Sequence, residues 1–287
     1  KMKKNKLKTG ILAGVLTALA PAAADAQVPE DIDPASRMGV LGANLALQTS
    51  ICGIVAAIND RNILKDIGQC FGGATIQYIG MEMGVHEVPV LPGFGLRTVE
   101  TGTSIIYNTL QGKEPFETLQ YEFAPVLLEI DTKKFDMRLF WRPYPIYGAI
   151  SFMVKGYKFN LGDTMNYQTP VFEMTRDNLN VVGQTEANLI AYDRNYPSAK
   201  AHEFTHVMQY VRYRPFQLLV PDSLGFLEDE AYLRIGEDIA KSITSFPNTI
   251  CHLGGESCSR RWWAIHELEA HAMASGYEDQ NKYEEVE

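Results

Sequence analysis

Two histidines four residues apart, with a glutamate after the first, are the residues best suited to chemistry in this chain. They form the stretch His202-Glu203-Phe204-Thr205-His206. On a helix, residues four apart share a face, so both imidazoles project together and suit two corners of a tetrahedral Zn²⁺ site. Glu203 would then lie beside the ion, where it can take a proton from bound water. We expect His202 and His206 as zinc ligands and Glu203 as the general base.

The neighbouring sequence predicts that this motif lies on a helix over about 198–214. Ser198 is a candidate N-cap and Pro215 is a stop signal. An apolar stripe at helical spacing would grip the core, and the histidines fall on a different face together with Gln209 and Tyr213. The stripe comprises Ala201, Phe204, Met208 and Val211. The alternative is a chance match, in which the histidines are ordinary, partly buried residues.

A catalytic zinc needs a third protein ligand and an open position for water. Two downstream clusters offer one. The segment 227–231 carries Glu228 and Glu230, at a distance from the motif that resembles thermolysin-like gluzincins. The segment 262–272 carries Glu269, followed by a small alanine that lets the helix backbone come close to the motif helix. We favour Glu269, and the alternatives are Glu230, then Glu228, Glu267 or a histidine.

The motif segment 202–210 also resembles the His-Glu-x-x-His-Val-x-Gln-(Tyr/Gln) stretch of a group of poorly characterised bacterial metallopeptidase-like proteins. In that group a Glu-x-Glu-Ala helix follows tens of residues later, and 267–270 matches it. The stretch 162–172 is also similar to strands that precede the motif in the group. The resemblance covers about the second half of the chain. It implies that His202, His206 and Glu269 bind zinc and that Glu203 is catalytic, and it implies no substrate.

This chemistry predicts a zinc peptidase acting on a peptide or protein substrate. Zinc would make its bound water more acidic, and Glu203 would take the proton and pass it to the leaving amine. Candidates for a second oxyanion donor are Tyr210, Tyr213, His266 and His271. No nucleophile elbow, Cys–His signature or Gly-rich phosphate cradle is present in the sequence.

The first 26 residues have the pattern of a cleavable signal peptide. Lysines form a basic start, Ile11 to Ala20 is apolar, and Ala24-Asp25-Ala26 is a cleavage site. We therefore expect an exported protein that begins at Gln27 and resides in the periplasm, in the cell envelope or outside the cell.

The composition is that of an ordinary globular protein, with 46% hydrophobic residues among 287. The chain is acidic, with 35 Asp and Glu against 26 Lys and Arg. This balance argues against nucleic acid as a partner and disfavours an anionic membrane surface. It does not specify an oligomeric state.

All four cysteines lie beyond the predicted cleavage site, which in an exported chain favours disulfides. The simplest of three pairings joins Cys52 to Cys70 and Cys251 to Cys258. Free buried thiols are the alternative.

The hydrophobic pattern predicts an α+β fold with N-terminal helices, a central antiparallel sheet and a C-terminal helical zinc-binding part. Residues 38–59 carry no charge and predict a buried or interface-facing helix, with a membrane helix as the alternative. A helical stretch over 63–83 is expected to break at Gly72-Gly73, and another helix covers 101–110. Apolar alternation predicts strands over about 120–193, including one at 150–154. Further helices are expected at 226–245 and 261–275.

The expected domains are a signal peptide at 1–26, a helical region at 27–115, and a β-sheet plus metallopeptidase-like domain at 116–287. Two other hypotheses remain. In one, the protein is a non-catalytic envelope binding or assembly protein with a structural or vestigial zinc site. In the other, residues 28–115 are a propeptide or membrane-associated segment that covers the active site.

Overall fold

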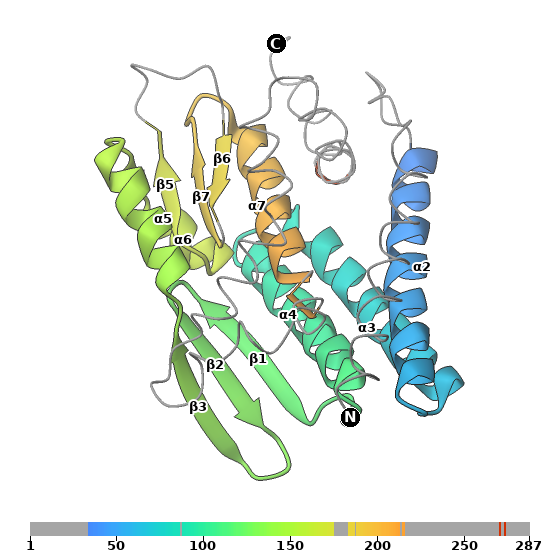
Figure 1. The fold of residues 1–287 in the computed structure, drawn as a ribbon. Helices are drawn as coiled ribbons and strands as arrows, with labels where there is room; N and C mark the ends of the chain where they lie inside the picture. The colour runs from blue at the N-terminus through green and yellow to red at the C-terminus, as the bar shows by residue number, and fades with distance from the viewer. Residues whose placement is uncertain are drawn as a thin grey trace, which may run out of the picture.

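A computed structural model describes residues 34–86, 88–174, 183–186, 188–212, 214–215, 270 and 273. These residues form a mixed α+β fold in which helices pack beside two small sheets (Figure 1). The elements in chain order are α2 (Pro34–Ile58), α3 (Ile63–Gly84), α4 (Leu91–Leu110), β1 (Thr118–Phe123), β2 (Val126–Asp131), β3 (Asp136–Trp141), α5 (Pro143–Val154), β4 (Lys158–Phe159), α6 (Leu161–Tyr167), β5 (Val171–Glu173), β6 (Gly183–Glu186), β7 (Leu189–Tyr192) and α7 (Pro197–Arg212).

The predicted N-terminal helices are confirmed as α2, α3 and α4. The Asn62 side chain accepts a hydrogen bond from the backbone N–H of Lys65 and so caps α3. The expected break at Gly72-Gly73 is wrong, because α3 continues through it to Gly84. The third helix begins at Leu91, ten residues before the predicted start at Thr101. Within the described residues, no helix combines the length and apolar character needed to cross a membrane.

Glycines allow α3 and α4 to pack closely. A Cβ on Gly73 would lie 2.8 Å from the backbone oxygen of Gly102, and one on Gly80 would lie 2.6 Å from that of Gly95. These separations are shorter than real Cβ contacts, so only glycine permits this distance between the helices. The predicted Cys52–Cys70 disulfide is present and joins α2 to α3. Cys251 and Cys258 lie outside the described residues.

A polar stripe on α4 supplies hydrogen bonds to the outer edge of β1. Glu100 accepts from the backbone N–H of Glu122 at 2.7 Å, and Ser104 accepts from that of Gln120 at 2.9 Å. The Asn108 side-chain amide donates to the carbonyl of Thr118 at 2.8 Å. Four helical residues rise about 6 Å and two strand residues about 6.6 Å, so the two repeats match. The helix therefore takes the place of a neighbouring strand.

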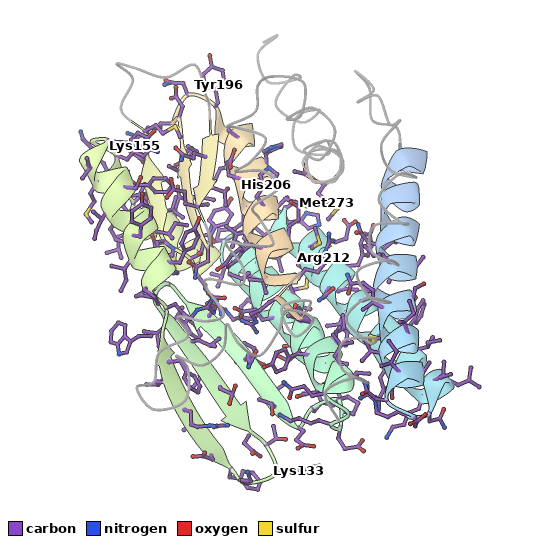
Figure 2. The ribbon with its side chains drawn as sticks, in the orientation of Figure 1. Lys133, Lys155, Tyr196, His206, Arg212 and Met273 are labelled. Carbon is purple, nitrogen blue, oxygen red and sulfur yellow. A yellow bond between two sulfur atoms is a disulfide. The ribbon has the colours of Figure 1, made fainter. Side chains whose placement is uncertain are left out.

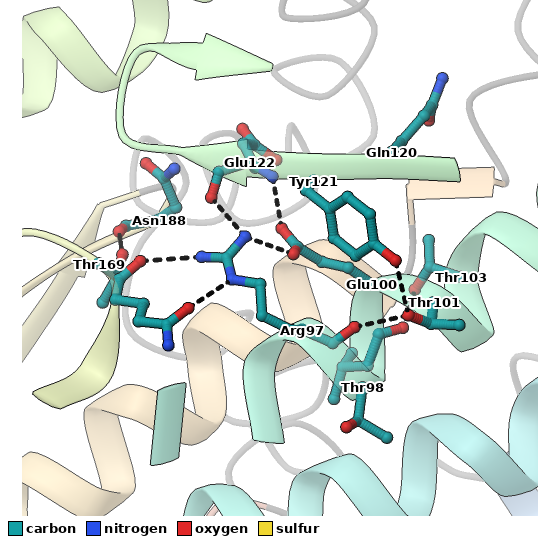
Figure 3. A network of polar contacts seen from close by, with 12 residues as sticks. Arg97, Thr98, Glu100, Thr101, Thr103, Gln120, Tyr121, Glu122, Thr169 and Asn188 are labelled. Carbon is teal, nitrogen blue, oxygen red and sulfur yellow. Dashed lines mark hydrogen bonds and ion pairs between the residues drawn. The ribbon is translucent and has the colours of Figure 1, made fainter. Parts of the chain in front are cut away.

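Buried charges extend this contact (Figure 3). The Arg97 guanidinium lies 2.5 Å from the Glu100 carboxylate and donates to the carbonyl of Glu122. Burial raises the pKa of Glu100 to about 7, although the positive charges of Arg97 and Arg214 act in the opposite direction. The Glu122 carboxylate lies 3.4 Å from both Arg142, before α5, and Arg214, after α7. The network therefore links α4, β1 and the segment that follows the motif helix.

The predicted sheet is present as two sheets with the orders β1-β2-β3 and β4-β5-β7-β6. All described strand pairs are antiparallel except β5 and β7, which are parallel. Strand β7 is buried on both faces. Ile190 and Tyr192 belong to the core cluster that includes α7, and Leu189 and Ala191 belong to the cluster that includes α5.

Two helices interrupt the stretch that was predicted as strands. Residues 150–154 belong to α5, which begins at Pro143 with proline in its first turn. The alternation of Ile150, Phe152 and Val154 therefore does not mark a strand, because only Phe152 of the three is buried. Residues 161–167 form α6, whose N-cap Asn160 accepts from the N–H of Asp163. The predicted strand around 181–182 lies outside the described residues.

Candidate metal centre

The motif lies on α7 as predicted, and the structure explains what fixes this helix. Phe204 and Met208 are fully buried, and Ala201 and Val211 are nearly so, which confirms the apolar stripe. The helix begins at Pro197, one residue earlier than expected, so Ser198 lies inside the first turn rather than at the cap. Proline is favoured at this first position because its missing N–H has no partner there in any case.

Ion pairs hold both ends of α7. Near its start, the Lys200 ammonium lies 3.1 Å from the Asp163 carboxylate, which also accepts a hydrogen bond from the Tyr192 hydroxyl at 2.6 Å. Burial and the bond to Asp163 raise the pKa of Tyr192. Beyond its end, Arg214 pairs with Glu122. The motif is therefore carried on a rigid element.

The two histidine side chains point toward one another, and Figure 2 shows His206 on α7 with Arg212 further along. Their Nε2 atoms are 3.1 Å apart. Two nitrogens each about 2.0–2.1 Å from one tetrahedral zinc lie roughly 3.3 Å apart, so the observed spacing fits a shared ion.

Gln209 sets the protonation of His206. Its Oε1 atom lies 2.8 Å from Nδ1 of His206, so Nδ1 donates to it. In a neutral ring the lone pair is then on Nε2, which faces His202. The Nε2 atom of His202 can therefore either donate a proton to this lone pair or share a cation with it. A hydrogen bond such as the one from Nδ1 to Gln209 is what orients a metal-binding histidine.

Glu203 is held against β6. It is 8% exposed, and the Thr185 hydroxyl lies 2.6 Å from its Oε2 and 2.9 Å from its backbone carbonyl oxygen. The single hydroxyl proton favours the carboxylate, which is the stronger acceptor. A Cβ on Gly183 would lie 2.5 Å from Oε1 of Glu203. Glycine at 183 and threonine at 185 therefore fix where this carboxylate lies.

The described residues contain only part of the predicted site. They bring together the Nε2 atoms of His202 and His206, and Glu203 lies against β6, but they contain no group of three or more histidine, cysteine or acidic side chains that could hold a metal. Glu269 and its alternatives Glu228, Glu230 and Glu267 lie outside the described residues. So do Tyr213, His252, His266 and His271.

Two described positions lie beside the preferred third ligand in sequence. Ala270 and Met273 are both helical, and they are 0% and 3% exposed. Met273 belongs to the same core cluster as Phe204, Val207 and Met208 of the motif helix, and Figure 2 shows it near α7. The downstream segment therefore contacts the motif helix at this point.

The contributions of Gly183 and Thr185 were not predicted. They precede the motif by about twenty residues, and no fixed spacing connects them to it. Only the pairing of β6 with β7, and the packing of α7 against both strands, brings them to Glu203. A short polar strand directly before the buried strand and the motif helix is the one sequence signal for them.

Comparisons with protein-family models, with curated proteins and with solved structures find no match for this chain. The argument for function therefore comes from the geometry described above.

Proposed function

We propose that this protein is an exported zinc-dependent peptidase in which His202 and His206 bind the ion and Glu203 is the general base. The observation that carries this proposal is the 3.1 Å separation of the two Nε2 atoms, and the carboxylate of Glu203, the residue after the first histidine, is held by Thr185. A coincidental pair of helix histidines does not require an oriented ring and a positioned acid next to it.

Glu269 is the proposed third ligand. If the predicted helix over 261–275 forms, Glu269 lies one turn before Met273 and shares its face. Met273 packs with the apolar residues of α7. This contact supports Glu269 as the ligand from the downstream segment.

The chemistry follows from these positions. A bound zinc ion would supply Lewis acidity, making a water molecule more acidic and polarising the scissile carbonyl. Glu203 accepts the proton of that water and later donates it to the leaving amine. Thr185 holds the carboxylate in place during both transfers, and Gln209 keeps the lone pair of His206 directed at the ion.

A peptide substrate fits the position of β6. This strand lies at one end of the order β4-β5-β7-β6 among the described strands, and it runs past Glu203. An extended peptide that pairs with such an edge has its carbonyl groups presented along the strand, next to the acid.

Metal analysis and a peptide-library assay of paired variants test the proposal. Glu203→Gln should keep about one zinc per chain and lose hydrolysis, because the amide cannot accept the proton. His202→Ala should lose zinc and activity together. If Glu203→Gln cleaves peptides as well as the parent, the protein is not this kind of peptidase.

One observation favours the alternative, a non-catalytic envelope protein with a structural zinc site. Glu203 is largely buried, and its carboxylate is engaged by Thr185, as in a closed site. Replacing the zinc with cobalt distinguishes a catalytic site from a structural one. A catalytic site should change its visible spectrum when a small anion such as cyanide occupies the open position, whereas a closed site should not.

A further inference from the structure

Exposed apolar side chains are concentrated in one part of the molecule, residues 135–165. This stretch forms β3, α5, β4 and α6. Its exposed large apolar residues are Phe135, Met137, Leu139, Trp141, Tyr144, Ile146, Tyr147, Ile150, Met153, Val154, Phe159, Leu161 and Met165. Scattered apolar residues are normal on a protein surface, but such a concentration marks an interaction surface.

The hairpin of β2 and β3 carries one end of this surface. The strand register pairs Met137 with Ile130, Leu139 with Leu128 and Trp141 with Val126. Because side chains alternate along a strand, these six residues share one face of the sheet. Phe135 lies in the turn of the hairpin and is 92% exposed. The hairpin thus presents an apolar face that continues to its tip.

Helix α5 carries the other end. Its inward side includes Phe152, which is fully buried against β5 and β7. Ile146, Ile150 and Met153 lie at helical spacing on the outer side and are 41–57% exposed. Helix α5 begins at Pro143, directly after the end of β3 at Trp141, and Figure 1 shows both elements along the same side of the molecule.

Lysines are exposed around this surface. In four ion pairs of this region the cation is more exposed than its partner. The pairs and their side-chain exposures are Lys133 with Glu117 (58% and 22%), Lys134 with Asp131 (78% and 13%), Arg138 with Glu129 (47% and 7%), and Lys155 with Glu186 (41% and 21%). In a fifth pair, Arg138 with Asp136, the anion is the more exposed partner (47% and 55%). Lys158 is exposed as well. The turn of the hairpin thus presents two exposed lysines, Lys133 and Lys134, although the whole chain is acidic.

We propose that the surface formed by β3, the β2–β3 turn and the outer side of α5 binds the surface of an anionic lipid bilayer. Apolar and aromatic side chains would enter the interface between headgroups and acyl chains, and the exposed lysines would contact the phosphates. Trp141, Tyr144 and Tyr147 have the amphipathic rings that favour this depth. The surface extends over one end of a sheet, its hairpin turn and one helix, which suits a broad bilayer better than a single peptide strand.

This proposal does not depend on the proposed zinc chemistry. It differs from the expectation drawn from the net charge, because the average over the chain does not describe this side of the molecule. It places the protein on a membrane, and among the residues that the structure describes no helix is long and apolar enough to span one.

Vesicle flotation tests the proposal. The full chain is mixed with vesicles of phosphatidylcholine alone or with about a third phosphatidylglycerol. We expect binding to the anionic vesicles and little to the neutral ones. The double substitution Met137→Glu with Leu139→Glu should reduce binding roughly tenfold or more. Met153→Glu with Val154→Glu should do the same from α5. All four residues are exposed, so folding should be retained, and circular dichroism checks this.

The matched control is Leu64→Glu with Phe71→Glu on α3, which changes two exposed apolar residues outside the proposed surface. Every protein compared carries the same first 26 residues. This basic and apolar segment therefore contributes equally to the vesicle binding of each one. Binding that is equal in the surface variants and the control would overturn the proposal. So would equal binding to neutral vesicles, or surface substitutions that only convert a dimer to a monomer in light scattering, since the face would then join two copies.

Discussion

Strands β7 and β3 are both rich in apolar residues, but they lie in opposite surroundings. All four residues of β7 are buried, because β5 and β6 flank it and α7 and α5 cover its two faces. Five of the six residues of β3 are exposed, because it lies at the end of its sheet in the order β1-β2-β3. Apolar composition alone therefore does not show which strand forms the core.

The difference also separates the regions on which the two proposals depend, the zinc site and the membrane-binding surface. The buried strand supports the motif helix and, through β6, the positions of Thr185 and Gly183 beside Glu203. The exposed strand does not contribute to that site and presents its side chains outward. Substitutions in the first region should affect stability and catalysis, and those in the second should affect neither.

Truncating one apolar side chain in each region gives the largest expected contrast. Ile190→Ala on β7 removes a fully buried side chain and should lower the free energy of unfolding by about 2–5 kcal/mol. Leu139→Ala on β3 removes a side chain that is 56% exposed and should change it by less than about 1 kcal/mol. Urea unfolding measures both. Similar losses would mean that β3 is covered in solution.

The pH dependence of stability offers a second comparison, between two carboxylates. Burial raises the pKa of Glu100 to about 7, so its folded state holds a proton that the unfolded chain releases above the ordinary value of 4.5. The contribution of Glu100 to the free energy of unfolding is thus greatest below pH 4.5. Roughly 2–3 kcal/mol of it is lost as the pH rises to about 7. Glu100→Gln should remove this dependence, measured by urea unfolding across that range.

The exposed Glu117 is the control for that experiment. The hydrogen bond from Lys133 lowers its pKa, so any stabilisation is present at neutral pH and is lost on acidification. Glu117→Gln should therefore leave the change of the free energy of unfolding between pH 4.5 and about pH 7 as it is in the wild type. If the free energy of unfolding changes with pH equally in the wild type and in Glu100→Gln, groups other than Glu100 determine the pH dependence.

Gly183→Ala should separate stability from catalysis in the buried region. The three atoms nearest to the added methyl group all belong to the side chain of Glu203, which can move, so the melting temperature should change little. The displaced carboxylate should reduce kcat about 100-fold. Gly72→Ala, where no atom lies within 4 Å of the new methyl, is the matched control and should keep full activity.

The smallest expected effect is at Thr185. Thr185→Val removes the hydroxyl beside Oε2 of Glu203 and should lower kcat about tenfold with KM unchanged. Thr185→Ser keeps the hydroxyl and should restore kcat. An unchanged kcat in Thr185→Val would leave this threonine with a packing role only.

The sequence allowed the motif helix to be predicted, because the spacing of His202 and His206 and the apolar stripe are local properties. It also allowed the N-terminal helices and the Cys52–Cys70 disulfide to be predicted. It failed at α5, because this helix is apolar on its outer side as well, so Ile150 and Val154 mimic the alternation of a strand. The parallel pairing of β5 with β7 and the contact of Thr185 with Glu203 depend on tertiary packing that one chain does not encode as a pattern.

The polar stripe of α4 has a consequence for how this protein can associate. Because Glu100, Ser104 and Asn108 already bond the outer backbone groups of β1, that margin of the sheet has no capacity for another polypeptide. In this three-stranded sheet, strand recruitment is therefore restricted to the opposite margin, and two copies that meet through it would pair β3 with β3.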